Sequence, residues 1–269
     1  MRALLIAALA LLALPVQAVE RVVSLAPSLN EVMLELGADD LLVGIIDGGI
    51  PVAPRIDHLP RLGRVGQVEM EQLLSLQPDL ILLWPDSIGS AQREQLQRLG
   101  IALHEMRPRR MDELADAVEL LGERIGRGEQ ARARVAEFRR RLAALRAEHR
   151  RERPLKVFYQ VWDRPLYTVG GEQFISDALR VCGAENVFAD LSLAAPQVSL
   201  ESVLLRAPEV ILTGEAAMLK DWQRWPQIPA VRMGQVWMIP DEGLQRPSLQ
   251  LLDATAALCR LLEGAQSAH

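Results

Sequence analysis

The chain has 269 residues and a formal net charge of −5. This length is sufficient for two α/β lobes of ordinary size. The acidic balance argues against nucleic acid or an anionic membrane surface as a partner.

The first 18 residues have the pattern of an export signal. Arg2 gives a short positive start, residues 3–14 are apolar, and Val16-Gln17-Ala18 fits a small-residue cleavage site. The apolar run is too short to span a bilayer, and no later stretch approaches the roughly 20 apolar residues that a span needs. We therefore expect a mature chain that begins near Val19 and is exported to the periplasm.

Residues 19–108 are expected to form an N-terminal α/β lobe, because short apolar runs alternate with helical patterns. The capping-box spacing of Ser28 and Glu31 predicts a helix that starts at about Leu29 and stops at Gly37. The Gly- and Pro-rich stretch 47–65 is expected to be a long loop. In chain order, the predicted elements are strand 21–25, helix 29–36, strand 41–46, helix 69–76, strand 80–84, helix 91–99 and strand 101–106.

Residues 109–153 lack a strand pattern and are expected to form a helical connector. Helices are predicted at 111–125 and 128–150, and the second would be about 35 Å long at 1.5 Å per residue. Apolar residues recur in it at spacings of three and four, which is typical of an amphipathic helix with one solvated face. A helix of that length can brace two lobes, so we expect little relative motion between them.

The alternation restarts in residues 154–269, which are expected to form a C-terminal α/β lobe. The predicted elements are strand 156–161, helix 172–181, a strand near Val187, helix 200–205, strand 210–213, helix 219–225, strand 236–239 and helix 249–262. Such alternation indicates largely parallel sheets with helices on both faces. The predicted fold class is therefore α/β, with two Rossmann-like lobes joined by one long backbone helix.

One pattern occurs once in each lobe. Residues 71–82 and 201–212 share Glu, Leu, Pro, Ile and Leu at the same offsets. Each copy predicts a short helix, a Pro that ends it, and a buried strand. Two similar lobes that face each other enclose a cleft, and a cleft is where a ligand site is expected.

Glu71 and Glu201 occupy equivalent positions in the two copies, in the first turn of each short helix. The helix dipole favours a carboxylate there, which explains either residue without a function. The alternative is that the pair presents one charge per lobe for docking onto a symmetric partner that carries basic residues.

The loops that follow strand ends are the candidate ligand-binding segments, because open α/β sheets bind ligands there. The candidate residues are Pro27, Gly48, Val65, Trp84, Trp162, Tyr167, Ala195, Glu242, Gly243, Leu244, Gln245 and Arg246. Trp84 and Trp162 each end an apolar strand and would offer flat apolar surface to a large ring, or else pack inside a lobe. Arg246 would bind ligand carbonyls or carboxylates, or else form a surface ion pair.

No catalytic or metal-binding motif is present. His58, His104, His149 and His269 are scattered, and their spacing does not match a zinc or manganese site. The chain has no GxSxG, no Gly-rich phosphate loop and no HExxH. We therefore predict a binding protein without catalytic residues, metal site or cofactor. The alternatives from other classes are an extracytoplasmic enzyme that uses the same cleft and a structural protein or chaperone without a ligand.

Cys182 and Cys259 are the two cysteines of the chain. In an oxidising compartment such a pair most often forms a disulfide, and two buried thiols are the alternative. The two residues lack a CxxC arrangement, so redox catalysis is not indicated.

Several motifs together resemble the helical-backbone (class III) periplasmic binding proteins, and in particular their cobalamin-binding members. These motifs lie at residues 24–31, 36–37, 43–44, 73–81, 181–188 and 196–201. The resemblance covers nearly all of the chain after residue 18. It implies two braced lobes that hold cobalamin or a related corrinoid, with the cobalt supplied by the transported ligand. It also implies a monomer that delivers this ligand to an inner-membrane ABC permease dimer with its ATPase subunits.

The resemblance also implies roles for particular residues. Glu71 and Glu201 match glutamates that dock onto permease arginines, and Cys182 and Cys259 match a disulfide. Trp84, Tyr167 and the loop 242–246 match positions that line the corrinoid cleft.

Gly48, Val65 and Ala195 depart from the cobalamin-binding pattern, which has large aromatic residues near these positions. Smaller side chains remove apolar contact with a ring. The alternatives are therefore weaker binding of a corrinoid, binding of a bulkier corrinoid, or a different ligand such as haem or a ferric siderophore. In a haem protein, Tyr167 would ligate the iron and Arg246 would bind a propionate.

Overall fold

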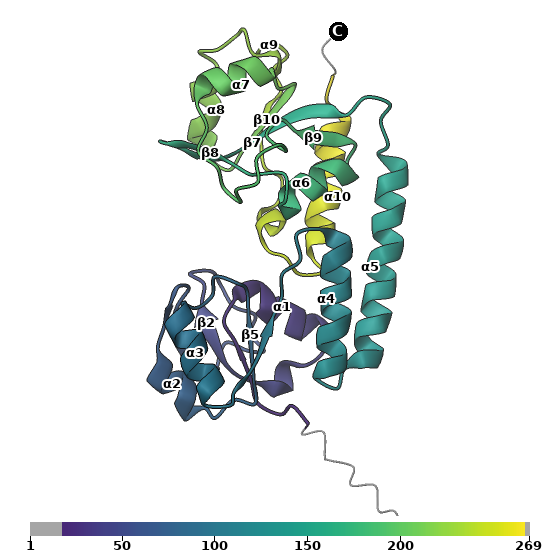
Figure 1. Cartoon of the computed structure of the whole chain (residues 1–269). Coiled ribbons are helices and arrows are strands. Elements are labelled where there is room, and N and C mark those ends of the chain that lie inside the picture. The colour runs from purple at the N-terminus through teal and green to yellow at the C-terminus, as the bar shows by residue number, and fades with distance from the viewer. Residues whose placement is uncertain (1–17, 267–269) are drawn as a thin grey trace, which may run out of the picture.

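The computed structural model describes residues 18–266, so the predicted export signal lies outside the described residues except for Ala18. Two α/β lobes are joined along one side by helices α4 (Met111–Arg124) and α5 (Gly128–Glu148), as Figure 1 shows. This arrangement is the predicted fold class. Within residues 18–266, no helix combines the length and the apolar content that crossing a membrane requires.

The N-terminal lobe is built on a six-stranded sheet with the order β4-β3-β2-β1-β5-β6, in which every pairing is parallel except that of β3 with β4. Its elements are β1 (Val22–Ser24), α1 (Pro27–Glu35), η1 (Asp39–Leu41), β2 (Leu42–Asp47), β3 (Arg61–Arg64), β4 (Gln67–Val68), α2 (Met70–Ser75), β5 (Leu80–Leu83), α3 (Ser90–Arg98) and β6 (Ala102–Glu105). Successive residues of a strand point to opposite faces of its sheet. Val22 and Leu80 therefore pack with α1 and α4, whereas Val23 and Ile81 pack with α2 and α3.

The C-terminal lobe has a five-stranded sheet with the order β11-β10-β7-β8, and β9 pairs with β7 as well. Its elements are β7 (Leu155–Asp163), β8 (Leu166–Thr168), α6 (Phe174–Val181), β9 (Ala184–Asn186), α7 (Leu200–Arg206), β10 (Val210–Thr213), α8 (Ala216–Trp222), α9 (Pro229–Arg232), β11 (Val236–Met238), η2 (Glu242–Gln245) and α10 (Leu251–Glu263). Val157 and Leu212 pack with α6 and α10, whereas Phe158 and Ile211 pack with α7, α8 and α9.

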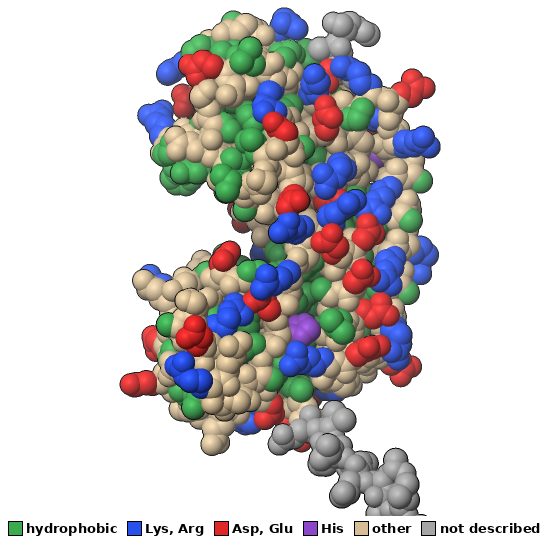
Figure 2. Space-filling model, in the orientation of Figure 1, with side chains coloured by type: hydrophobic (Ala, Val, Ile, Leu, Met, Phe, Trp, Pro, Cys, Tyr) green, Lys and Arg blue, Asp and Glu red, His purple; other side chains and the backbone are tan. Residues whose placement is uncertain are grey.

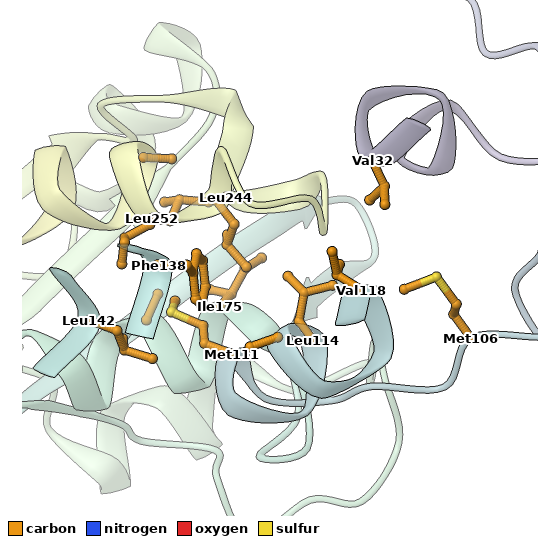
Figure 3. Close-up of a cluster of buried hydrophobic side chains, with 14 of the residues drawn as sticks. Val32, Met106, Met111, Leu114, Val118, Phe138, Leu142, Ile175, Leu244 and Leu252 are labelled. Atoms are coloured by element: carbon orange, nitrogen blue, oxygen red, sulfur yellow. The ribbon is translucent and has the colours of Figure 1, made fainter. Parts of the chain in front are cut away.

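A single apolar core runs from one lobe to the other through the connector helices. Figure 3 shows part of it, where Val32 of α1, Leu114 and Val118 of α4, Phe138 of α5 and Leu252 of α10 are all buried. Separating the lobes would expose this shared surface at a cost of about 25 cal/mol per Å². The shared core therefore opposes separation of the lobes, and small relative motion between them stays a prediction.

Ion pairs locate α5 against both lobes. Near its start, Arg127 donates to Asp40 of the N-terminal lobe at 2.7 Å, and further along Arg141 pairs with Asp253 of α10. Exposed pairs of this kind contribute little stability. They show, however, that α5 begins on one lobe and ends on the other, as expected for a brace.

The repeated pattern of the sequence has a structural counterpart. Gln77 (φ 46°) and Ala207 (φ 47°) are the two non-glycine residues with positive φ within residues 18–266, and each precedes the Pro of its copy. A non-glycine residue rarely adopts this backbone conformation. Its occurrence at equivalent positions supports the two-lobe interpretation.

Three sequence expectations about local structure are wrong. The predicted loop 47–65 contains β3, which pairs with β4 as a hairpin, and strand β8 was not predicted. The capping box is also absent, because Ala26 is the N-cap of α1 and Ser28 lies inside the helix. The Ser28 hydroxyl accepts a hydrogen bond from Trp84 Nε1 instead (3.0 Å).

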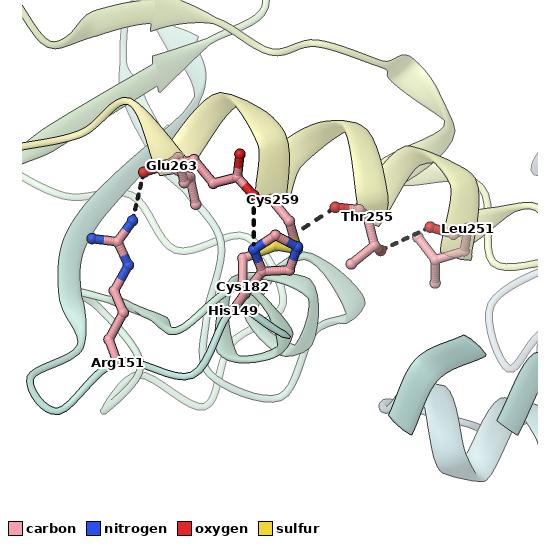
Figure 4. The surroundings of a disulfide bond; sticks show 8 residues. His149, Arg151, Cys182, Leu251, Thr255, Cys259 and Glu263 are labelled. Carbon is pink, nitrogen blue, oxygen red and sulfur yellow. Dashed lines mark hydrogen bonds and ion pairs between the residues drawn. A yellow bond between two sulfur atoms is a disulfide. The ribbon is translucent and has the colours of Figure 1, made fainter. Parts of the chain in front are cut away.

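The predicted disulfide between Cys182 and Cys259 is confirmed, so the two residues are not free thiols. It joins the residue after α6 to α10 with a Cα–Cα distance of 4.7 Å. Figure 4 shows two neighbouring links that join α10 to the segment after α5, from His149 to Glu263 and from Arg151 to the Leu262 carbonyl. Together these contacts hold α10 within the C-terminal lobe.

Replacing Cys182 and Cys259 by Ala together is expected to lower the free energy of unfolding by about 2–4 kcal/mol. The bond spans 77 residues, so its loss allows the unfolded chain many more conformations. Because both cysteines belong to one lobe, ligand affinity at 25 °C should not change. Urea denaturation and ligand titration of the variant check both statements. Equal stability of variant and wild type would contradict the predicted loss of stability. Weaker ligand binding by the variant would contradict the prediction that affinity does not change.

The N-terminal lobe also bonds directly to the segment that precedes α10. Glu35 at the end of α1 accepts hydrogen bonds from the backbone N–H groups of Leu249 (3.0 Å) and Gln250 (3.1 Å). Burial raises the pKa of Glu35 from its ordinary 4.5 to about 7, although these two N–H groups act in the opposite direction. The Glu35 carboxylate thus bonds the N-terminal lobe to the segment before α10, but burying its charge costs desolvation free energy.

The free energy of unfolding should therefore decrease as the pH rises and Glu35 loses its proton. A pKa that is higher in the folded than in the unfolded protein gives stability that is complete below about pH 4.5 and is lost as the pH rises through about 7. Glu35→Gln should remove this contribution, which is on the order of 1–3 kcal/mol between pH 5 and pH 8. Denaturant titrations of both proteins across this range measure the difference. Parallel pH profiles would refute the assignment.

Candidate ligand-binding cleft

A cleft lies between the two lobes, opposite the connector helices, and hydrophobic side chains gather on its upper rim (Figure 2). It consists of three adjoining hollows of about 580, 820 and 220 Å³. Pro27, at the start of α1, lines all three. The hollows therefore adjoin one another around Pro27, and together they offer room for a sizeable ligand.

The N-terminal lobe supplies one aromatic side chain to the cleft, that of Trp84, which directly follows β5. The indole Nε1 donates to Ser28 Oγ at 3.0 Å, and the Trp84 backbone N–H donates to Ser87 Oγ at 2.9 Å. These bonds fix the ring while it lines the first hollow together with Val65. Trp84 thus contacts both the core and the cleft, so neither of the two interpretations of this residue excludes the other.

The C-terminal lobe supplies Trp162 near the end of β7. Its side chain lines the second hollow and is 51% exposed, so it does not pack inside the lobe. By contrast, Trp222 is buried against Phe158 on the outer face of the sheet. Trp162 is therefore available to a ligand.

Exposed apolar side chains concentrate at the cleft. Of the nine large hydrophobic residues that are exposed within residues 18–266, five line it, namely Ile50, Val65, Val161, Trp162 and Met238. A clustered apolar surface of this kind usually marks an interaction site. The sequence analysis identified Val65 and Trp162 but not the other three.

The loop 242–246 contributes lining residues to the cleft from the C-terminal lobe. Asp241 caps η2 by accepting from the Gly243 N–H at 2.7 Å, and Leu244 anchors the loop in the core. Gln245 then faces the hollows. Arg246 lines the cleft and also donates to Glu31 of α1 at 3.1 Å, so the ion-pair alternative is observed and a ligand contact of Arg246 stays a prediction.

Two predicted ligand residues do not line these hollows. Gly243 is a buried residue of the loop 242–246, and Tyr167 lies on β8, paired with Trp162 of β7. The other predicted positions all line the cleft: Pro27, Gly48, Val65, Trp84, Trp162, Ala195, Glu242, Leu244, Gln245 and Arg246. A ligand role for each of them stays a prediction.

Gly48 has a steric reason to be glycine. A Cβ atom at this position would lie 2.3 Å from Cγ of Pro27. A large aromatic residue here would therefore require the start of α1 to move.

Tyr159 and Val161 line the first hollow but were missed, because candidate residues were sought only in the loops that follow strand ends. Tyr159 and Val161 are two residues apart and therefore lie on the same face of β7. This spacing was the signal in the sequence that could have identified them. Burial raises the pKa of Tyr159 to about 12, so its hydroxyl stays protonated at neutral pH.

One group of side chains in the described part of the chain is close enough to share a metal ion. Glu148, His149 and Glu263 meet where α5 ends beside α10, next to the disulfide and outside the cleft. His149 Nδ1 lies 3.3 Å from Glu263, and the His149 side chain is buried. This cluster contributes nothing to the cleft.

Glu71 and Glu201 are exposed in the first turns of α2 and α7, the equivalent positions that the repeated pattern predicted. The two helices belong to different lobes and lie on the side of the molecule away from α5 (Figure 1). Hydrogen bonds from its own backbone N–H and from Ser199 hold the pKa of Glu201 below its ordinary value. Glu201 is therefore charged at neutral pH.

Comparison with known proteins extends over both lobes. A protein-family model described as "Periplasmic binding protein" matches residues 22–242. A vitamin B12-binding protein of Vibrio cholerae serotype O1 is 34% identical over 259 residues, which cover 95% of this chain and 93% of that protein. A vitamin B12-binding protein of Yersinia pseudotuberculosis is 31% identical over 266 residues, which cover 96% and 92%.

Solved structures agree. The periplasmic vitamin B12-binding protein BtuF of Vibrio cholerae matches with a TM-score of 0.81 and 32% identity, covering 91% of this chain and 97% of that one. The periplasmic heme-binding protein HutB of the same organism matches with a TM-score of 0.78 at 21% identity, which shows a common fold only. The chain therefore belongs to the periplasmic binding protein family, in its helical-backbone class, and is a binding component of transport rather than an enzyme.

Proposed function

We propose that the protein binds cobalamin, or a closely related corrinoid, in the cleft between its lobes and delivers it to an ABC permease dimer. The observation that carries this proposal is the 34% identity to a vitamin B12-binding protein across 95% of the chain, which includes both walls of the cleft. The protein would act in the periplasm as a monomer that holds one ligand.

The physical character of the cleft supports this ligand. A corrinoid is a broad ring, and the cleft offers apolar surface from both lobes, including Trp84 and Trp162. Burying apolar surface contributes about 25 cal/mol per Å², and aromatic side chains bury large areas. The shared core of the lobes also preforms the cleft, which lowers the entropic cost of binding.

The small residues at Val65 and Ala195 widen the first hollow relative to a cleft with aromatics at these positions. We therefore propose that the protein tolerates corrinoids with bulky substituents, at some cost in contact area. Gly48 is held small by Pro27, so this part of the cleft differs for a steric reason.

Haem is disfavoured by the same geometry. Tyr167, the expected iron ligand, does not line the three hollows. Arg246, the expected propionate partner, is already paired with Glu31. The heme-binding structures that match this fold are too distant in sequence to indicate a shared ligand.

The proposal is tested by the visible spectrum of the mature protein after incubation with an equimolar mixture of cyanocobalamin and haem, followed by desalting. We expect a retained corrinoid band at one per chain. Retention of haem alone would replace the proposed ligand, and a colourless protein that is folded by circular dichroism would refute the proposal.

For delivery, we propose that Glu71 and Glu201 dock the two lobes onto basic residues of the two permease subunits. Both carboxylates are exposed, one on each lobe, and both lie on the side away from the brace. Complementary charges of this kind fix register and orientation across an interface.

A further inference from the structure

The charges that line the cleft are predominantly negative. Asp86 lines the first hollow, and Glu215 and Glu242 line the second. Within residues 18–266 none of these three carboxylates forms an ion pair. Arg246 is the one basic residue that lines any of the three hollows.

The charge of Arg246 is neutralised by Glu31. Glu31 Oε1 accepts from Arg246 Nη1 at 3.1 Å, and Oε2 accepts from Ser248 Oγ at 2.9 Å. The Glu31 side chain is 17% exposed and Ser248 is fully buried, so the carboxylate is held in place by its surroundings. Because Glu31 belongs to α1 and the other two residues to the C-terminal lobe, the pair is fixed by both lobes.

We propose that Glu31 makes the cleft selective for ligands whose edge carries uncharged amides and against ligands that carry carboxylates. The inference rests on the proposed function, since it concerns the same cleft. Glu31 is a positioning residue that acts through Arg246. With Arg246 neutralised, a ligand carboxylate would meet three like charges and no unpaired cation.

A carboxamide fits the same surroundings. Its carbonyl can accept from the guanidinium N–H groups of Arg246 that face the cleft, and its NH₂ can donate to Asp86, Glu215 or Glu242. The side chains at the rim of a cobalamin ring are amides of this kind. Haem, in contrast, carries two propionates.

The test compares two ligands, cyanocobalamin and its derivative in which one side-chain amide is hydrolysed to a carboxylate. Affinities for the mature wild-type protein, Glu31→Gln and Glu35→Gln are measured by equilibrium dialysis at pH 8. Glu35→Gln is the matched control, because it makes the same change one turn further along α1, where the side chain bonds backbone N–H groups and not Arg246. Gln at position 31 can still accept hydrogen bonds, so the fold should persist.

We expect the wild type to bind the amide form about 10-fold more tightly than the carboxylate form. Glu31→Gln should reduce this ratio to about 2-fold, because it frees the charge of Arg246. Glu35→Gln should leave the ratio at its wild-type value. Raising the salt concentration to about 0.5 M should narrow the wild-type ratio, since screening weakens interactions between charges but not a packing effect.

Equal wild-type affinities for the two ligands would overturn the inference while leaving the proposed function intact, because cyanocobalamin would still bind. A change in ratio as large in Glu35→Gln as in Glu31→Gln would overturn the role of Glu31. If folded wild-type protein binds neither ligand, the proposed function fails and this inference fails with it.

Discussion

Replacement of both Glu71 and Glu201 by Arg is expected to abolish ligand-dependent stimulation of the permease ATPase by this protein, while ligand affinity stays at its wild-type value. Each substitution turns an exposed carboxylate, one per lobe, into a cation. A cation opposed to basic permease residues costs several kcal/mol, and both halves of the interface would be affected at once. Each single variant should retain part of the stimulation.

The measurement is ATP hydrolysis by the permease in proteoliposomes at saturating binding protein. A matched control replaces Glu129 and Glu148 by Arg, because both are exposed glutamates of α5, on the opposite side of the molecule. The control should stimulate like the wild type. Undiminished stimulation by the Glu71 and Glu201 double variant would remove the docking proposal.

Truncation of Trp84 and Trp162 to Ala together is expected to weaken cobalamin binding by about 100- to 1000-fold. The two indoles line the cleft from different lobes, so the double variant loses apolar contact on both sides of the ligand. Trp162→Ala alone should lower affinity with little effect on stability, because its side chain is half exposed. Trp84→Ala should lower both, since it also loses its bond to Ser28.

Isothermal titration with cyanocobalamin measures these affinities, and thermal unfolding in the absence of ligand separates binding from stability. Trp225→Ala is the matched control, because Trp225 packs on the outer face of the C-terminal sheet, away from the cleft. That variant should lose stability but keep its affinity. Wild-type affinity in the double Trp variant would show that the ligand binds elsewhere.

The overall architecture was predictable because its signals are local or repeated. The pattern that recurs at residues 71–82 and 201–212 predicted two similar lobes, and the long amphipathic helix predicted the brace. The β3–β4 hairpin was not predicted, because its two strands are short and lie in or beside a Gly-rich stretch. The glycine at position 63 was the only hint in the sequence. In the structure Gly63 has a φ of 91° and lies close to the Gln67 carbonyl, and both features require glycine.

The candidate site was predictable only in part. The rule that ligands bind beyond strand ends placed Trp84 and Trp162 at the cleft. It missed contacts between distant segments, such as Trp84 with Ser28, which are 56 residues apart, and Arg246 with Glu31, which are 215 apart. Such pairs have no local signal, because the partner of a polar side chain is chosen by tertiary structure. The capping-box prediction failed for the same reason.

The central claim is that one corrinoid binds between the two lobes, in contact with both. Crystals of the mature protein grown with cyanocobalamin can be measured at the cobalt absorption edge, where anomalous scattering locates the metal without reference to the protein. The account predicts a single cobalt position per chain, in the cleft between Trp84 and Trp162. A cobalt on the outer surface of either lobe, or none in crystals of the folded protein, would contradict it.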